Sequence, residues 1–158
     1  HQMGETFVVP KAKIQDNTHY IPGTDGQKMS KSKNNIINIF LPEKNLRKQI
    51  MGIKTNSTPL EDPKDPKNCN IFALYELMAP DSSIKSLREK YLNGGMGYGY
   101  AKQLLFELIL ERFQIEREKF DYYFQNPEEV QIALAKGAEK ARKVAHGVLL
   151  RVRDKLGY

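Results

Sequence analysis

The sequence is short of the residues that build disulfides and metal centres. Cys69 is the only cysteine among 158 residues, so no disulfide can form within the chain, and a reducing cytoplasm is the expected compartment. The three histidines are His1, His19 and His146, and no group of histidine and cysteine has the spacing of metal ligands. We therefore predict a cytoplasmic protein with no tightly bound metal.

Long apolar runs are also missing. The hydrophobic fraction is 40%, an ordinary value for a soluble protein, and no run approaches the length that crosses a membrane. No segment resembles a signal peptide. The sequence accordingly predicts no membrane partner, and its length suits one or two small domains.

Positive charge is concentrated in one segment. The chain carries a net charge of +6. Segment 28–54 holds seven basic residues and one acidic residue, so its own net charge of +6 equals that of the whole chain. Such a concentration predicts a polyanionic partner, either nucleotide phosphates or a nucleic acid backbone. Charge alone does not choose between these partners.

The apolar pattern predicts a mainly α-helical chain. Pro42 suits the first turn of a helix, and Leu46, Ile50 and Ile53 share one face of it. Helical spacing resumes at residue 71 and continues to the C-terminus. The later helices are expected to run from Ile71 to before Pro80, from a cap at Asp81 or Ser82, from about Tyr100 to Phe124, and from Asn126-Pro127 onward.

Glycine-rich and small-residue stretches punctuate this pattern. The run 94–99 meets neither phosphate-loop glycine spacing, so we interpret it as a helix end and a tight turn. In the last helix, small and apolar residues recur at steps of three and four, which predicts close helix packing in a bundle. These residues are Leu134, Gly137, Ala138, Ala141, Ala145, Gly147, Val148 and Val152.

The beginning of the chain differs in character. Phe7-Val8-Val9, ended by Pro10, predicts a strand, and a weaker strand candidate lies around Tyr20-Ile21. Two strands cannot form a stable sheet alone, so residues 1 to about 40 are expected to be the tail of a larger α/β domain. Three prolines in segment 55–69 exclude a regular helix or a central strand there. The predicted organisation is residues 1–54, a linker 55–70, and a helical domain 71–158.

One short run carries the strongest chemical signal. Residues 28–32 read Lys28-Met29-Ser30-Lys31-Ser32 and follow the turn-rich segment 23–27. Hydroxyl and backbone N–H groups in such a loop can form an anion site, and two ammonium groups can close on phosphate oxygens. The alternative interpretation is a solvated basic loop.

The run resembles the KMSKS signature of class I aminoacyl-tRNA synthetases at all five positions. Other segments are similar to bacterial tryptophanyl-tRNA synthetases, so that the resemblance extends over nearly the whole chain. They read GETFVVP at 4–10, IPGTDGQ at 21–27, DPKDP at 62–66, CNIFALY at 69–75, GYGYAK at 97–102 and GAEKAR at 137–142. The family's other signature, a His-x-Gly-His type run, is absent from this sequence.

The resemblance implies a fold and a site. Residues 1–54 would be the C-terminal remnant of a Rossmann-type catalytic domain, followed by an anticodon-binding helical domain. ATP would be a substrate with Mg²⁺ accompanying it, and Lys28 and Lys31 would stabilise charge on the departing pyrophosphate. The further ATP-contacting residues would be Met29, Ser30, Ser32 and Ile21.

The resemblance also implies partners. L-tryptophan would bind in a missing N-terminal half, so the fragment alone is expected to be inactive, and the parent is expected to be a homodimer. Residues 71–158 would contact tRNA(Trp). The candidate phosphate contacts there are Lys85, Arg88, Lys102, Lys140 and Arg142.

Two other readings remain open from the sequence. The related tyrosyl-tRNA synthetases share the signature loop, although segment 62–75 argues against them. A stand-alone helical RNA-binding module, whose basic loop contacts only backbone phosphate, belongs to a different functional class.

Overall fold

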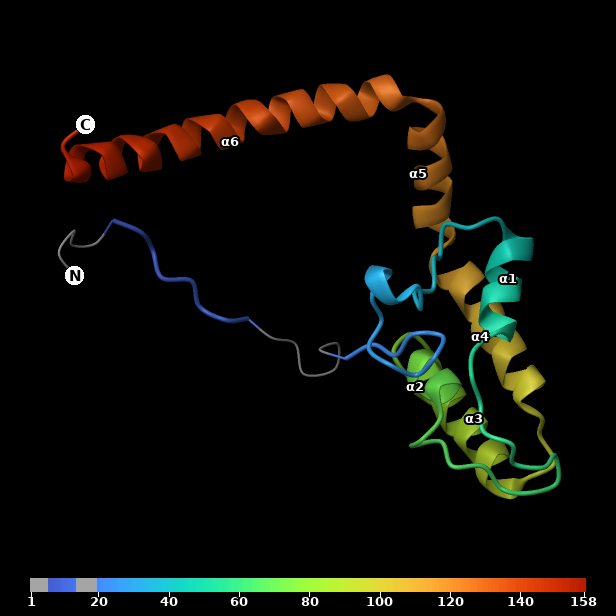
Figure 1. Ribbon diagram of the computed structural model, residues 1–158. Helices are drawn as coiled ribbons and strands as arrows, with labels where there is room; N and C mark the ends of the chain where they lie inside the picture. Colours follow the sequence, from blue (N-terminus) through green and yellow to red (C-terminus); the bar gives the residue numbers. More distant parts are fainter. Residues whose placement is uncertain (1–5, 14–19) are drawn as a thin grey trace. The chain divides into compact units, whose positions relative to one another are not determined.

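The structure, a computed structural model, describes residues 6–13 and 20–158 (Figure 1). Within these residues the regular elements are helical. They are a 3₁₀ turn η1 (Lys31–Lys33) and the helices α1 (Glu43–Met51), α2 (Asn70–Glu76), α3 (Asp81–Asn93), α4 (Tyr98–Arg112), α5 (Gln114–Gln125) and α6 (Pro127–Leu156). The prediction of a mainly α-helical chain is confirmed.

The two predicted strands are wrong. Over residues 6–13 and 20–158 the only β pairing is an isolated antiparallel bridge between Pro22 and Lys28. Phe7, Val8 and Val9 are largely exposed. A strand needs a neighbour for its backbone hydrogen bonds, and no described segment offers one beside residues 7–9.

The chain divides into two compact units. One comprises Gln15–Glu118, and the other comprises His1–Ile14 with Lys119–Tyr158. In the first unit, α1 and α2 both pack against α4. Its fully buried side chains include Leu46, Ile50, Ile53, Ile71, Phe72, Leu87, Tyr91, Ala101 and Leu105. The apolar faces expected around residues 46–53 and 71–91 are therefore the faces that form the core.

Residues on both sides of segment 55–70 contribute to this one core. The segment itself contains no helix or strand between Gly52 and Asn70, as its three prolines predicted. The domain limits 1–54, 55–70 and 71–158 stay a prediction.

The single long helix expected from about Tyr100 to Phe124 is wrong, because the helix breaks at Phe113. This residue has φ −111° and ψ 19°, outside the helical range. The hydrogen bonding continues around the break, since Phe113 N–H donates to the Ile109 carbonyl and Arg117 N–H donates to the Phe113 carbonyl. The apolar residues of the sequence also continue across this point. The sequence pattern therefore gave no indication of the break.

The turn between α3 and α4 confirms the predicted role of the glycine run. Gly94 has φ +74° and ψ −172°, a conformation that is open essentially to glycine alone. A Cβ on Gly94 would lie 2.2 Å from the Glu61 carbonyl oxygen. The predicted cap at the other end of α3 is wrong: Pro80 occupies the N-cap position, and Asp81 is already helical.

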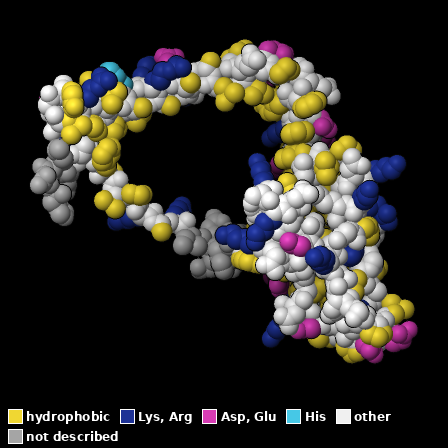
Figure 2. All heavy atoms as spheres, viewed as in Figure 1, with side chains coloured by type: hydrophobic (Ala, Val, Ile, Leu, Met, Phe, Trp, Pro, Cys, Tyr) yellow, Lys and Arg dark blue, Asp and Glu magenta, His cyan; other side chains and the backbone are white. Residues whose placement is uncertain are grey.

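Helix α6 begins at Pro127, as predicted, but its expected packing seam is absent. None of its residues is buried, and a Cβ on Gly137 or Gly147 would have no neighbour within 4 Å among residues 6–13 and 20–158. Small residues allow close approach between helices but provide little apolar surface to drive it. Hydrophobic side chains consequently remain on the surface of α6 (Figure 2). Among the described residues, no helix is both long and apolar enough to cross a membrane.

Candidate phosphate-binding loop

Residues 21–35, here called the signature loop, fold as a short hairpin with an irregular tip. Met29 N–H donates to the Ile21 carbonyl over 2.8 Å, and Gly23 N–H donates to the Gln27 carbonyl over 2.7 Å. These two bonds frame the bridge between Pro22 and Lys28. Gly26 turns the tip with φ +84°, a conformation that favours glycine.

A buried asparagine organises the interior of the signature loop. The side chain of Asn35 is only 2% exposed. Its Oδ1 accepts from Ser30 N–H over 2.8 Å, while its Nδ2 donates to Asp25 Oδ1 at 2.7 Å and to the Lys28 carbonyl at 3.2 Å. The loop is therefore built around one amide side chain.

Asp25 completes the tip. Its Oδ1 also accepts from Gln27 N–H over 2.9 Å, which forms an Asx turn. Donation from Asn35 is the main cause that lowers the pKa of Asp25 below its usual value, with Gln27 N–H acting in the same direction. The carboxylate at the tip is thus held in its charged form by the loop that it closes.

The signature run itself faces solvent. Lys28, Lys31 and Ser32 are exposed, and the hydroxyl oxygens of Ser30 and Ser32 lie 2.9 Å apart. Neither lysine forms an ion pair with any described residue. Asn34, in the left-handed region at φ 52°, ends the 3₁₀ turn. Two ammonium groups and two hydroxyls are accordingly presented on one exposed loop, a set that suits phosphate oxygens.

Two backbone groups of the predicted ATP-contacting residues take part in the loop's own hydrogen bonds. Ser30 N–H is bonded to Asn35, so only its hydroxyl remains as a donor toward a ligand. The Ile21 carbonyl accepts from Met29 N–H. The predicted contacts of Met29, Ser30 and Ile21 with ATP stay predictions.

The signature loop is fastened to the helical core. The Thr24 carbonyl accepts from the N–H of Lys54, just beyond α1, over 2.8 Å. Gln49 of α1 holds the segment that follows the loop, donating from Nε2 to the Ile36 carbonyl at 2.6 Å and accepting from Asn38 N–H at 2.9 Å. These hydrogen bonds therefore fix the position of the loop relative to α1.

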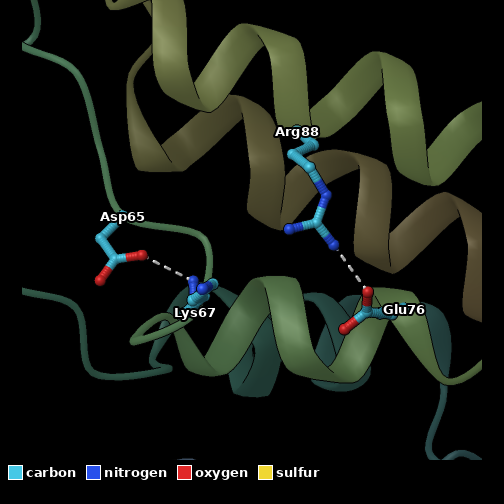
Figure 3. A network of polar contacts seen from close by, with 4 residues as sticks. All are labelled: Asp65, Lys67, Glu76 and Arg88. Atoms are coloured by element: carbon cyan, nitrogen blue, oxygen red, sulfur yellow. Dashed lines mark hydrogen bonds and ion pairs between the residues drawn. The ribbon is translucent and has the colours of Figure 1, made fainter.

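The five candidate RNA-contacting residues fall into two groups. Lys85 on α3, together with Lys140 and Arg142 on α6, is exposed. Arg88 pairs with Glu76 at 2.8 Å, as Figure 3 shows, and its guanidinium lies 4.8 Å from the ring centre of Phe72. Lys102 donates from Nζ to the Met51 carbonyl over 2.8 Å, and burial lowers its pKa. The last two cations thus have structural partners within the chain.

A further lysine is fully built into the core unit. Lys64 is 2% exposed, and its Nζ donates to the carbonyls of Pro59, Leu60 and Asp62 at 2.8, 3.3 and 3.1 Å. It lies 5.6 Å from the ring centre of Tyr98. This ammonium group closes the proline-rich segment onto the start of α4 and is not offered to a ligand.

Comparisons with known proteins place this geometry in a family. The family model described as tRNA synthetases class I (W and Y) matches residues 2–114. The chain therefore belongs to the class I tRNA synthetases of this group. The curated relatives include tryptophan–tRNA ligases of Rhodopirellula baltica, 46% identical over 157 residues, and Campylobacter jejuni strain RM1221, 43% identical over 157 residues.

The match covers 99% of this chain but only 49% of each of these two relatives. The chain spans about half the length of the curated relatives that it matches. A solved structure agrees: tryptophanyl-tRNA synthetase from Campylobacter jejuni, complexed with ADP and tryptophan, has 44% identity and a TM-score of 0.84. It is matched over 99% of this chain and 49% of its own. The predicted resemblance to tryptophanyl-tRNA synthetases is confirmed, and neither alternative reading is favoured.

Sequence reasoning missed Asn35 and Asp25. The Asp25-Gly26 pair is a turn signal that was available, because aspartate accepts hydrogen bonds from the backbone two residues on. Asn35 carried no comparable signal. Its role depends on three groups that only the folded hairpin brings together.

Proposed function

We propose that the full-length gene product containing this chain is a tryptophan–tRNA ligase, which activates tryptophan with ATP and transfers it to tRNA(Trp). This chain supplies the loop that contacts the ATP phosphates and helices that contact tRNA. The L-tryptophan site is assigned to the part of the full-length protein that corresponds to the unmatched half of the relatives. The observation that carries the proposal is the exposed, hydrogen-bonded hairpin presenting Lys28 and Lys31 without ion-pair partners among the described residues.

The role of the loop follows from where charge develops. When the amino-acid carboxylate attacks the α-phosphate of ATP, negative charge grows on the departing pyrophosphate. Ammonium groups placed beside that charge stabilise the transition state more than the ground state. Lys31 and Lys28 are assigned this task, and the hydroxyls of Ser30 and Ser32 donate to the same phosphate oxygens.

Mg²⁺ belongs to this proposal as the companion of the nucleotide. Magnesium is commonly held by substrate phosphates and a few carboxylates. The donor set of the signature run, ammonium and hydroxyl groups, fits phosphate and not a cation. In the described ranges there is no cluster of three or more histidine, cysteine, aspartate or glutamate side chains. We therefore assign Mg²⁺ to the phosphate chain of bound ATP.

The test is tryptophan-dependent exchange of pyrophosphate into ATP by the full-length gene product. Lys31→Ala is expected to lower kcat about 100-fold, the order expected for loss of one transition-state contact, with little change in KM for tryptophan. Lys33→Ala is the matched control, because it removes the same charge from an exposed residue two positions on. Equal rates for wild type and Lys31→Ala would overturn the role assigned to the loop.

The tRNA-binding part of the proposal is supported by the exposed cations Lys85, Lys140 and Arg142. Phosphate contacts predict affinity that falls steeply with salt, whereas anticodon reading predicts preference for the CCA anticodon that the family resemblance implies. The experiment titrates tRNA(Trp) and a version changed only in the anticodon against the full-length gene product at two salt concentrations. Equal affinities would leave only nonspecific electrostatic binding.

We further propose a domain organisation and an oligomeric state for the full-length protein. Residues 1–54 belong to a Rossmann-type catalytic domain, 55–70 form a linker, and 71–158 form the tRNA-binding helical domain. The full-length protein is a homodimer. Sedimentation of the full-length protein tests the dimer, and a monomer at assay concentration would contradict it.

A further inference from the structure

The side chain of Asn35 uses all its hydrogen-bonding groups inside the signature loop. The amide oxygen accepts from the N–H of Ser30, within the signature run. The amide nitrogen donates to Asp25 at the tip and to the Lys28 carbonyl. Its own backbone carbonyl accepts from Thr24 N–H at 2.9 Å. One residue therefore joins the tip, both ends of the hairpin and the run that carries the exposed lysines.

The fit around this amide is tight. A Cβ placed on Gly23 would lie 2.5 Å from Cγ of Asn35, so the amide rests directly on the glycine backbone. A buried amide must satisfy both its acceptor and its donors, and an unpaired buried group costs free energy. Aspartate has the same length but lacks the two donors, and would set a carboxylate against Asp25. The site accepts asparagine specifically.

The same assembly is anchored to the helical core from outside. The Thr24 carbonyl accepts from the N–H of Lys54, which follows the buried Ile53 just beyond α1. On the other side of the tip, a Cβ on Gly26 would lie 2.6 Å from Nδ2 of Asn70, at the start of α2. The tip of the loop is thus in contact with a residue just beyond α1 and with the start of α2, and both of these helices pack on α4.

We propose that Asn35 and Asp25 act as a positioning pair, which fixes the signature run so that Lys28 and Lys31 meet the phosphates of the nucleotide. This inference rests on the function proposed above. Neither residue is assigned a contact with the nucleotide: Asn35 is buried, and the accepting oxygen of Asp25 is already bonded twice. Their effect passes through the backbone at Lys28 and Ser30. Displacing a catalytic group by about 1 Å can cost on the order of 100-fold in rate.

The experiment measures pyrophosphate exchange by the full-length gene product in four variants. Asn35→Asp replaces the donated hydrogen bond by two facing carboxylates and is expected to lower kcat by about 10- to 100-fold, with KM for tryptophan changed less than about threefold. Asn35→Asp combined with Asp25→Asn exchanges the partners and restores one amide–carboxylate bond. This double variant is expected to recover at least threefold of the lost rate but to stay below wild type, because a carboxylate at position 35 cannot donate to the Lys28 carbonyl. Such partial recovery is the coupling expected of residues in contact.

The other two variants are references. Asn45→Asp makes the same chemical change at an exposed position of α1 and is expected to leave the rate unchanged. Lys31→Ala reports on the function of the loop itself. A loss with Lys31→Ala but none with Asn35→Asp overturns the positioning pair alone, whereas no loss with Lys31→Ala overturns the proposed function.

A readout independent of activity accompanies the rates. Protection of the Met29 and Ser30 amides from hydrogen exchange is expected to fall at least tenfold in Asn35→Asp and to recover in part in the double variant. If Asn35→Asp melts below the assay temperature, Asp25→Ala replaces it, since it removes only the acceptor, at a partly exposed position. An unchanged rate and unchanged amide protection in Asp25→Ala would then overturn the positioning pair.

Discussion

Lys64 holds its ammonium group 5.6 Å from the centre of the Tyr98 ring, inside a collar of three backbone carbonyls. Within the part of the chain that the structure describes, Lys64 has no carboxylate partner, and it acts as a hydrogen-bond donor to the backbone. The proline-rich segment lacks regular structure, so its carbonyls depend on such a partner to be satisfied.

Lys64→Met keeps the length of the side chain but leaves three carbonyls without their donor. We expect a loss of about 1–3 kcal/mol in the free energy of unfolding. Denaturant unfolding followed by tyrosine fluorescence measures it. Lys67→Met is the control, because Lys67 is exposed and only its backbone N–H bonds to Asp65 (Figure 3). Equal effects of the two substitutions would contradict the assigned role.

Gly94 and Gly95 offer a matched pair at the end of α3. Both have positive φ, but only Gly94 lies against another backbone, that of Glu61. Gly95→Ala is expected to cost about 1–2 kcal/mol from backbone strain alone. Gly94→Ala adds a steric clash and is expected to cost on the order of 3 kcal/mol or more. Chemical denaturation compares them, and a larger effect at Gly95 would contradict the contact between Gly94 and the Glu61 backbone.

Truncation of an apolar side chain should have different effects on stability in the two units. Ile50→Ala removes a fully buried side chain of α1 and is expected to cost about 2–5 kcal/mol. Leu134→Ala on α6 removes a side chain that is 67% exposed, and we expect a change within about 0.5 kcal/mol. Thermal unfolding of both variants provides the comparison. A large loss at Leu134 would mean that α6 is packed in solution.

Asp25 should make the signature loop sensitive to acid. Its folded-state pKa lies below its ordinary value of 3.8, because the carboxylate accepts from Asn35 and Gln27. A depressed folded pKa adds stability that is fully present above the unfolded value and is lost as pH falls through the folded value. The melting temperature of wild type should therefore exceed that of Asp25→Asn near neutral pH, with the difference closing below pH 3.8. A difference independent of pH would contradict this account.

The ion pair between Arg88 and Glu76 should contribute little. Both side chains are more than a third exposed, and exposed pairs contribute about 0.2–1 kcal/mol. A double-mutant cycle with Arg88→Ala and Glu76→Ala measures their coupling. A coupling well above that range would mean that the contact of Arg88 with the Phe72 ring also depends on Glu76.

Helix positions could be predicted from the sequence because apolar spacing and proline placement act locally. Leu46 and Ile50 lie on the same face of their helix whatever the rest of the chain does. Pro127 begins α6 as expected. The signature run could be recognised because its five residues are contiguous. These features need no knowledge of distant contacts.

The features that could not be predicted depend on contacts with residues distant in the sequence or leave no trace in the apolar pattern. Phe7 to Val9 have strand composition, but pairing requires a second segment that the described residues do not provide. The break at Phe113 leaves the apolar spacing intact, so periodicity could not reveal it. Asn35 becomes informative only after the hairpin brings Asp25, Lys28 and Ser30 around it.

Helix α6 is the longest helix of the described chain, and yet none of its residues is buried. Far-ultraviolet ellipticity registers helix wherever it lies, whereas heat capacity and denaturant sensitivity follow the surface removed from water. Ellipticity will therefore record a gradual helix–coil transition of α6 superimposed on the sharp unfolding of Gln15–Glu118. Calorimetry will record mainly the sharp transition, and the calorimetric and ellipticity curves will not coincide.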